Sequence, residues 1–272
     1  MEHKRIAFIG AGNMASAIIA GLCNSGYPAS QITATAPSLT RRQPLEDKFG
    51  IQTTDNNLQA ANDADVVVLA VKPQLMEAVC QPLQILDFSS KLVITIAAGI
   101  SAARYNQFLG QAVKLVRVMP NTPSLLGKGM SGLYAESSIP TQDQQFADML
   151  MRAVGEVCWV EQESKINQVI AAAGSAPAYF FLFMEAMQQE AIRQGMDADT
   201  ARLLVQQSAI GAAEMVKANP ELTLSMLREQ VTSKGGTTAE AIRTFNEHHL
   251  SDTVAKAMQA AVTRAQEMEK LF

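Results

Sequence analysis

The chain is poor in the residues that build metal sites and disulfide frameworks. Its 272 residues include only three cysteines, three histidines and one tryptophan. The cysteines, Cys23, Cys80 and Cys158, are odd in number and far apart, and none has the spacing of a metal-ligand pair. We therefore expect no metal site and no disulfide framework, and we expect a reducing compartment such as the cytoplasm.

Charge of either sign is also scarce. Charged residues make up 18% of the chain and hydrophobic residues 48%, and the net charge is −4. This composition indicates a globular protein rather than a disordered one. Because the small excess of charge is negative, we expect no attraction to nucleic acid or to an anionic membrane.

One uncharged segment resembles a membrane span, but it is short. Val169 to Met184 is rich in alanine and phenylalanine, and Gly174, Ser175 and Pro177 interrupt it. A usual span has about 20 apolar residues, so a helix inside a large core or a subunit interface is the better interpretation. Met1 to Arg5 is charged, but the apolar run after it is too short for a signal peptide, and we expect none.

The first part of the chain alternates between short apolar runs and helical segments. The runs predict strands at "RIAFIG", "QITAT", "GIQTT", "DVVVLAVKP", "KLVITIAAG", "KLVRVMPNTP", "GMSGLYA" and "EVCWVE". Several are apolar without alternation, which is typical of strands buried on both faces of a parallel sheet. Helices are expected between them at Met14–Asn24, Leu45–Phe49, Leu58–Asn62, Ala102–Leu109 and Asp143–Val154. This order predicts an α/β Rossmann-type doubly wound sheet.

After about Glu163 no further strand is expected, and the rest of the chain is predicted to be all-α. Asp197 and Ser251 are candidate N-caps in this part. Helices are expected at Ile166–Ala173, Ala176–Arg193, Ala198–Ala218, Leu224–Val231, Ala239–Glu247 and Asp252–Lys270. We therefore expect a dinucleotide-binding domain at residues 1–161 and an all-helical domain at residues 162–272.

The loop "FIGAGNMASAI" has the G-x-G-x-x-A pattern, with Gly10, Gly12 and Ala15. Gly10 permits a tight turn, Gly12 lets the backbone approach a pyrophosphate, and Ala15 lets helix and strand pack closely. The free N–H groups at the helix start, around Asn13 and Met14, then hold the phosphates. A plain strand-to-helix turn is the alternative, but a position between the first strand and the first helix favours a dinucleotide site.

The end of the second expected strand indicates which dinucleotide binds. An NAD site usually has Asp or Glu there, but no acid occurs from Ile32 through Gln43. Hydroxyl and guanidinium groups stand there instead, which suit a 2′-phosphate; they are Ser38, Thr40, Arg41 and Arg42. We expect NADP(H), with NADH as a possible second cofactor. The alternative for either arginine is an ordinary solvated charge.

Three more loops follow expected strands, at the edge where such sheets bind ligands. Small residues and prolines in them allow close contact with a flat ring. The candidate cofactor-binding residues are Val71, Lys72, Pro73, Ala97, Ala98, Gly99, Met119, Pro120, Asn121 and Thr122, together with Asn56 for the adenosine ribose. For each proline alone, simple loop punctuation is the competing interpretation.

The motifs "FIGAGNMASAI", "AVKPQ", "TIAAG", "VRVMPNTP", "GSAPAYFF" and "VTSKGGTTAEAI" occur in order along nearly the whole chain. Together they resemble the pyrroline-5-carboxylate reductase family. The resemblance implies a Rossmann domain that binds the nicotinamide cofactor and a helical domain that interlocks with its copy in a homodimer, which can stack into a ring of dimers such as a decamer. It implies reduction of L-1-pyrroline-5-carboxylate to L-proline, the last step of proline biosynthesis.

The second glycine-rich loop, "QVTSKGGTTAEAI", is suited to an anion because backbone N–H groups at a helix start are free donors. The resemblance places it in the substrate site, with Thr238 near the ring nitrogen as the candidate catalytic, positioning residue. The other candidate substrate-binding residues are Ser175, Pro177, Ser233, Gly235, Gly236 and Thr237. The alternative is a helix cap made by Thr237 or Thr238. The chain departs from the family at Lys234, where proline is frequent, and at Ala176, where glycine is frequent.

Hydride transfer to a cyclic iminium needs orientation more than acid–base chemistry, since the cofactor supplies the hydride. Two other functions compete with this one. A reductase of β-hydroxyacids would need a catalytic lysine, for which Lys165 is the nearby candidate, although the glycine-rich partner motif is missing. A cofactor-binding regulator without turnover would have no need of the "GGTT" loop.

Overall fold

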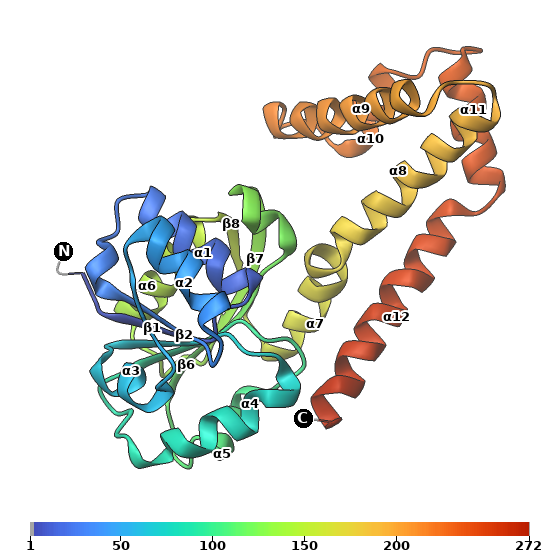
Figure 1. The fold of residues 1–272 in the computed structure, drawn as a ribbon. Helices are drawn as coiled ribbons and strands as arrows, with labels where there is room; N and C mark the ends of the chain where they lie inside the picture. The colour runs from blue at the N-terminus through green and yellow to red at the C-terminus, as the bar shows by residue number, and fades with distance from the viewer. Residues whose placement is uncertain (1–2, 272) are drawn as a thin grey trace. The chain divides into compact units, whose positions relative to one another are not determined.

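The computed structural model describes residues 3–271, which divide into two compact units. The first unit extends to Pro177 and includes the segment from Ala260 onward, and the second is Ala178–Gln259. The first unit contains a sheet with the strand order β3-β2-β1-β4-β5-β6-β7-β8, in which only the β6–β7 pair is antiparallel (Figure 1). The strands are β1 Ile6–Ile9, β2 Ile32–Thr35, β3 Gln52–Thr54, β4 Val66–Leu69, β5 Leu92–Thr95, β6 Lys114–Met119, β7 Gly129–Ala135 and β8 Gly155–Trp159.

Helices cover both faces of this sheet. The helices α1 (Asn13–Asn24), α2 (Leu39–Phe49) and α6 (Thr141–Arg152) pack on one face. The other face is covered by α3 (Asn57–Asp63), α4 (Pro73–Cys80) and α5 (Ala102–Phe108). Short 3-10 turns are η1 Ala29–Gln31, η2 Gln81–Ile85, η3 Thr122–Leu126 and η4 Glu163–Lys165. Two-sided burial explains the uninterrupted apolar run of β4, and the predicted doubly wound fold is confirmed.

Two helices differ from the sequence-based expectation. Helix α2 begins at Leu39 rather than Leu45 and contains Pro44 as its sixth residue, where the missing N–H removes one helical hydrogen bond. Helix α4 was not expected at all. Pro73 ends the extended segment after β4, but it is also the first residue of α4, where a missing N–H costs nothing.

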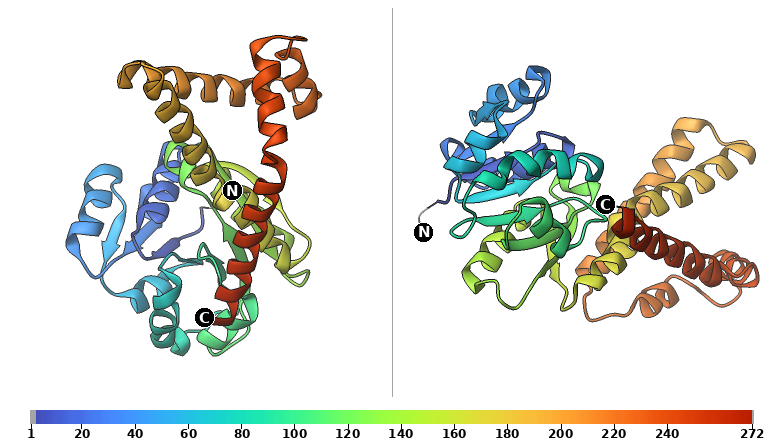
Figure 2. Two further views of the ribbon diagram at one scale, coloured as in Figure 1. Left: turned by 90° about the vertical axis from the view of Figure 1, so that its right-hand side faces the viewer. Right: turned by 90° about the horizontal axis from the view of Figure 1, so that it is seen from below.

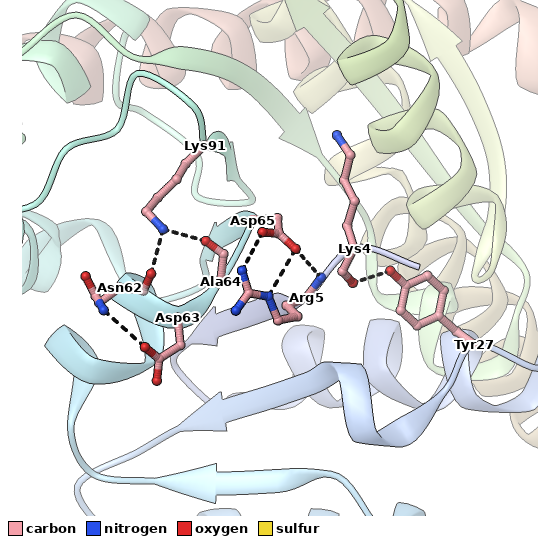
Figure 3. Close-up of polar contacts among 8 residues, drawn as sticks. All are labelled: Lys4, Arg5, Tyr27, Asn62, Asp63, Ala64, Asp65 and Lys91. Atoms are coloured by element: carbon pink, nitrogen blue, oxygen red, sulfur yellow. Dashed lines mark hydrogen bonds and ion pairs between the residues drawn. The ribbon is translucent and has the colours of Figure 1, made fainter. Parts of the chain in front are cut away.

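Ion pairs and hydrogen bonds fix the amino-terminal edge of the sheet (Figure 3). The Arg5 guanidinium and backbone N–H both donate to the Asp65 carboxylate, and the N–H groups of Asp65 and Val66 donate to the Arg5 carbonyl. Lys91 Nζ donates to the carbonyls at the end of α3, those of Asn62 and Ala64. These bonds hold the starts of β1, β4 and β5 together at the edge opposite the expected ligand loops.

The helical part of the chain carries the remaining elements. These are α7 Ile166–Val169, a π-helical segment η5 Ile170–Gly174, α8 Ala176–Arg193, α9 Ala198–Ala218, α10 Leu224–Gln230, α11 Thr237–Glu247 and α12 Leu250–Leu271 (Figure 2). Asp197 caps α9 by accepting from Thr200 N, as predicted. The prediction for Ser251 is wrong, because α12 already begins at Leu250. His249, at φ 54°, makes the turn before it in a conformation that glycine adopts more readily.

Helix α8 presents large apolar side chains to solvent in the single chain. Phe180, Phe181 and Leu182 are 67%, 62% and 67% exposed, and none of the described residues of α8 is buried. Of the two interpretations offered by the sequence, a core helix is therefore excluded for α8 within the single chain, and a subunit interface remains. The continuous helical stretch Glu163–Arg193 is long and apolar enough to cross a membrane by length and composition alone, which is weak evidence by itself. These side chains need cover from outside the chain.

The Arg5–Asp65 pair generates a prediction for stability. Hydrogen bonds from Arg5 lower the pKa of the Asp65 carboxyl. A lowered pKa stabilises the fold above the unfolded-state pKa of about 4, and this stabilisation is lost as pH falls through the folded-state value. Asp65→Asn should lower Tm at neutral pH by an amount equivalent to less than about 1 kcal/mol, since the pair is exposed.

The deficit in Tm should shrink as pH falls below about 4, because the wild-type carboxyl is then protonated too. The matched control is Asp63→Asn, which removes the same charge two residues away without removing an ion pair to Arg5. A Tm deficit of Asp65→Asn that is independent of pH would contradict this origin.

Candidate active site

The first glycine loop has the geometry of a phosphate cradle at the point where the strand order reverses. Gly10 has φ +111°, and a Cβ there would lie 2.6 Å from the carbonyl oxygen of Ala70, so no side chain fits. Gly12 precedes α1 as its N-cap, and a Cβ there would meet nothing within 4 Å among the described residues. Open space therefore faces the free N–H groups of Asn13 and Met14, and no acid stands in this turn.

A buried threonine holds this loop in place, and sequence reasoning missed it. The N–H of Gly10 donates to Thr35 Oγ1 over 3.2 Å, and that hydroxyl donates to Asn57 Oδ1 over 2.6 Å. Thr35 is only 1% exposed. A threonine is common in strands, so nothing in the sequence distinguishes this one. The structure thus adds Thr35 and Asn57 as residues that position the cradle.

The two neighbouring arginines that follow β2, Arg41 and Arg42, have different surroundings in the structure. Arg42 donates to the Ala36 carbonyl and pairs with Asp55 at 3.5 Å, so it serves the fold. Arg41 is exposed, and within residues 3–271 the structure records no partner for it. Ser38 and Thr40 lie beside it and are hydrogen-bonded to each other through their hydroxyls. One guanidinium is therefore free here, and the two hydroxyls leave one O–H donor between them, because the other is used in their own bond.

The loops after β3, β4 and β5 are held by local contacts. Asn56 accepts from Gln59 N as the N-cap of α3, which engages its carbonyl oxygen. Val71 packs against the Gly10 turn, and Lys72 precedes α4 as its N-cap residue. In the next loop, Ala97 N donates to the buried Thr95 hydroxyl, which also bonds Tyr105. Burial raises the pKa of Tyr105, so its hydroxyl stays protonated.

The loop after β6 is tied to the π-helical segment by Asn121. Its side chain donates to the Ala173 carbonyl over 3.0 Å and accepts from Met130 N over 2.9 Å, and the residue is 8% exposed. The Asn121 amide is therefore engaged inside the protein. Met119 packs where a Cβ on Gly174 would lie, at 2.7 Å. These contacts place Ser175 and Pro177 next to the end of β6.

Topology brings most of the predicted cofactor residues together. Strands β1, β2, β4, β5 and β6 are parallel, so the loops after them lie along the same edge of the sheet, within the first unit. This edge carries the expected residues from Gly10 to Thr122, and the switch point lies between β1 and β4. The arrangement fits a dinucleotide, and the cradle at Gly12 is the part that the structure defines most sharply.

The "GGTT" loop lies in the second unit and forms the start of α11. Gly235 has φ +69°, and Gly236 is the N-cap, without a side-chain bond. The alternative in which Thr237 or Thr238 is the cap is excluded, since both are already helical. A Cβ on Gly236 would lie 2.5 Å from Ser233 Oγ. Thr237 and Thr238 are exposed, so their N–H groups and hydroxyls face solvent in the first turn.

Both parts of the chain match known protein families. Residues 5–99 match the family model described as NADP oxidoreductase, coenzyme F420-dependent, and residues 163–268 match pyrroline-5-carboxylate reductase dimerisation. A pyrroline-5-carboxylate reductase from Vibrio alginolyticus is 70% identical over 272 residues, which is 100% of both chains. The chain belongs to the pyrroline-5-carboxylate reductase family. The resemblance seen in the sequence motifs is confirmed.

Solved structures of the pyrroline-5-carboxylate reductase family have the same fold. The enzyme from Coxiella burnetii superposes with a TM-score of 0.93 at 42% identity, covering 98% of this chain and 99% of the other. The pyrroline carboxylate reductase of Plasmodium falciparum was solved with NADP bound. It has a TM-score of 0.86 at 27% identity and covers 99% of each chain.

The two glycines of the first loop generate contrasting predictions. Gly12→Ala should leave Tm nearly unchanged, because its φ of −81° suits alanine and the space is open. It should weaken binding of NADPH by about 1–3 kcal/mol, because the new methyl occupies the cradle. Gly10→Ala should instead lower Tm sharply, since it forces a methyl against the Ala70 backbone at positive φ.

Calorimetric titration with NADPH and thermal melting on the same proteins distinguish the two effects. Gly12→Ala with wild-type NADPH affinity would show that the space at Gly12 is not the phosphate cradle.

Proposed function

We propose that this protein reduces L-1-pyrroline-5-carboxylate to L-proline with NADPH, the last step of proline biosynthesis, with NADH as a possible second cofactor. The observation that carries the proposal is full-length membership of the pyrroline-5-carboxylate reductase family at 70% identity. The test is consumption of NADPH that depends on pyrroline-5-carboxylate and yields proline. A purified protein that binds NADPH but makes no proline would contradict the proposal and would support a regulator without turnover.

The cofactor residues have separate tasks in this proposal. First-turn N–H groups of α1 bind the pyrophosphate next to Gly12, and Arg41 with Ser38 binds the 2′-phosphate. The loops at Val71–Pro73, Ala97–Gly99 and 119–122 orient the nicotinamide ring. Bound there, NADPH supplies the hydride. Asn56 is proposed for the adenosine ribose; its amide nitrogen remains available while its oxygen caps α3.

The substrate residues lie at the start of α11 and after η5. We propose that the backbone N–H groups of Gly235 and Thr237 hold the substrate carboxylate, assisted by Ser233. Gly236 keeps side chains away from this place, and its own N–H donates to the Ser233 carbonyl. The Thr238 hydroxyl hydrogen-bonds the ring nitrogen and so fixes the orientation of the imine. Ser175 and Pro177 are kept as proposed substrate-binding residues from the sequence. Exposure of both threonines in the single chain supports their availability.

We propose that the protein is a homodimer through its helical domain, which can assemble further into a ring of dimers such as a decamer. The match to a dimerisation family and the exposed apolar side chains of α8 support the dimer. Light scattering should give at least twice the mass of 29.3 kDa. A stable, folded monomer at micromolar concentration would contradict it.

We also propose the surroundings and domain limits expected from the sequence. The protein works in the cytoplasm without nucleic acid, membrane or resident metal; the three cysteines are free thiols, which suits a reducing compartment. We retain domains at residues 1–161 and 162–272, supported by the family match that begins at residue 163. The compact units divide later, near Pro177, because α7 and η5 contact β7 of the sheet; the first unit also includes the end of α12.

Arg41 provides the test of cofactor choice. Arg41→Ala should raise KM for NADPH by about tenfold to a hundredfold, the loss of one or two charge-assisted bonds, and should leave KM for NADH unchanged. Arg42→Ala is the control, because its partners are Asp55 and Ala36; it should lower Tm with a smaller effect on NADPH. Steady-state kinetics with both cofactors measure this. Equal losses with NADH and NADPH for Arg41→Ala would refute a role in binding the 2′-phosphate.

Thr238 provides the test of the substrate site. Thr238→Ala should lower kcat/KM for the imine by about tenfold to a few hundredfold, while NADPH binding and Tm change little, since Gly236 is the N-cap. Thr238→Ser should retain much of the activity because the hydroxyl survives. Thr244→Ala, on the same helix, is the control. Full kcat/KM in Thr238→Ala would remove this residue from the reaction.

A further inference from the structure

A buried arginine on strand β6 forms ion pairs with two carboxylates from distant parts of the chain. Arg117, on β6, is 2% exposed, and its Nη1 donates to Glu163 over 2.5 Å. Its Nη2 is buried without a hydrogen-bond partner among the described residues, and Glu269 of α12 lies 3.6 Å away as its ion-pair partner. Glu269 also accepts from Asn167 Nδ2 over 3.2 Å. The last turn of α12 is therefore fixed to the sheet by charge.

Glu163 and Met268, the residue before Glu269, both contact the loop between β5 and α5. Glu163 accepts from Ala102 N over 2.6 Å, at the end of this loop. Met268, next to Glu269, covers Gly99 in its middle: a Cβ on Gly99, which has φ +74°, would lie 2.9 Å from Met268 Cβ. At the start of the loop, Ala97 N is held by Thr95. The loop is thus fixed at its start, middle and end, and two of these contacts depend on partners of Arg117.

We infer that Glu269 is a positioning residue of the cofactor site, which holds Met268 against Gly99 and so sets the shape of loop 96–101. The inference rests on the proposed function, in which Ala97–Gly99 contacts the nicotinamide half of NADPH. Glu269 itself touches Arg117 and Asn167, so its effect on the cofactor passes through Met268.

Charge balance identifies Glu269 as the position to change. Removing Arg117 would leave two partly buried carboxylates without their counter-charge and a gap where the buried guanidinium lies, which would damage the fold broadly. Removing the charge of Glu269 leaves Arg117 paired with Glu163, so the fold should persist. Glu269→Gln also retains an oxygen that accepts from Asn167. The variant therefore loosens the last turn of α12 without stranding a buried charge.

The experiment measures NADPH binding by its fluorescence, with turnover and Tm on the same proteins. Glu269→Gln should raise Kd and KM for NADPH by about three- to thirtyfold, with kcat and KM for the imine within about twofold of wild type. The control is Glu267→Gln on the same helix, whose exposed partner is Arg264; it should behave as wild type. A lower Tm with unchanged Kd for NADPH would make Glu269 merely structural and overturn the inference.

A double-mutant cycle tests the route through Met268. Met268→Ala should raise Kd for NADPH in the same way, and the double variant Met268→Ala with Glu269→Gln should be no worse than the poorer single variant. Additive effects would overturn the route. If wild-type protein neither binds NADPH nor makes proline, the proposed function fails. If wild type does both and Glu269→Gln binds NADPH equally well, only this inference fails.

Discussion

The narrow gap between the carboxyl ends of β1 and β4 is the constraint on which the site depends. At Gly10 the chain passes so close to Ala70 that no Cβ fits, and it must take a positive φ to turn into α1. Because the turn is this tight, α1 starts directly after Gly12, and its free N–H groups lie at the switch point between β1 and β4. The Arg5–Asp65 pair at the opposite edge keeps the same two strands adjacent.

The loops at this edge of the sheet are fixed by hydrogen bonds from side chains of the first unit. Thr35 binds the N–H of Gly10, Thr95 binds that of Ala97, and Asn121 joins the loop after β6 to the π-helical segment. Such support leaves little freedom in the loops proposed to contact the cofactor, as orientation of a hydride donor requires. The helical unit differs in that large apolar side chains such as Phe180 and Phe181 are more than half exposed in the single chain.

Patterns that depend on near neighbours were predictable from the sequence. The apolar run of β4 indicated burial on both faces, and the glycine pattern indicated a tight strand-to-helix turn at Gly10 and Gly12, because both signals follow from local backbone and burial rules. Helix α4 was missed because Pro73 stops a strand and starts a helix with equal ease. The sequence left a cap by Thr237 or Thr238 open as an alternative, because glycine and threonine can both cap a helix and only the structure shows Gly236 in this role.

The sequence by itself determined the family, the doubly wound sheet, the all-helical second half and the loops that bear the candidate site. Only the tertiary structure decided which polar groups remain free for a ligand. Arg41 and Arg42 are neighbours with the same chemistry, yet only Arg42 meets Asp55 and Ala36. Likewise, the burial of Arg117 between Glu163 and Glu269 joins residues far apart in the chain. Pairing of this kind depends on distance in space, and local sequence patterns carry no information about it.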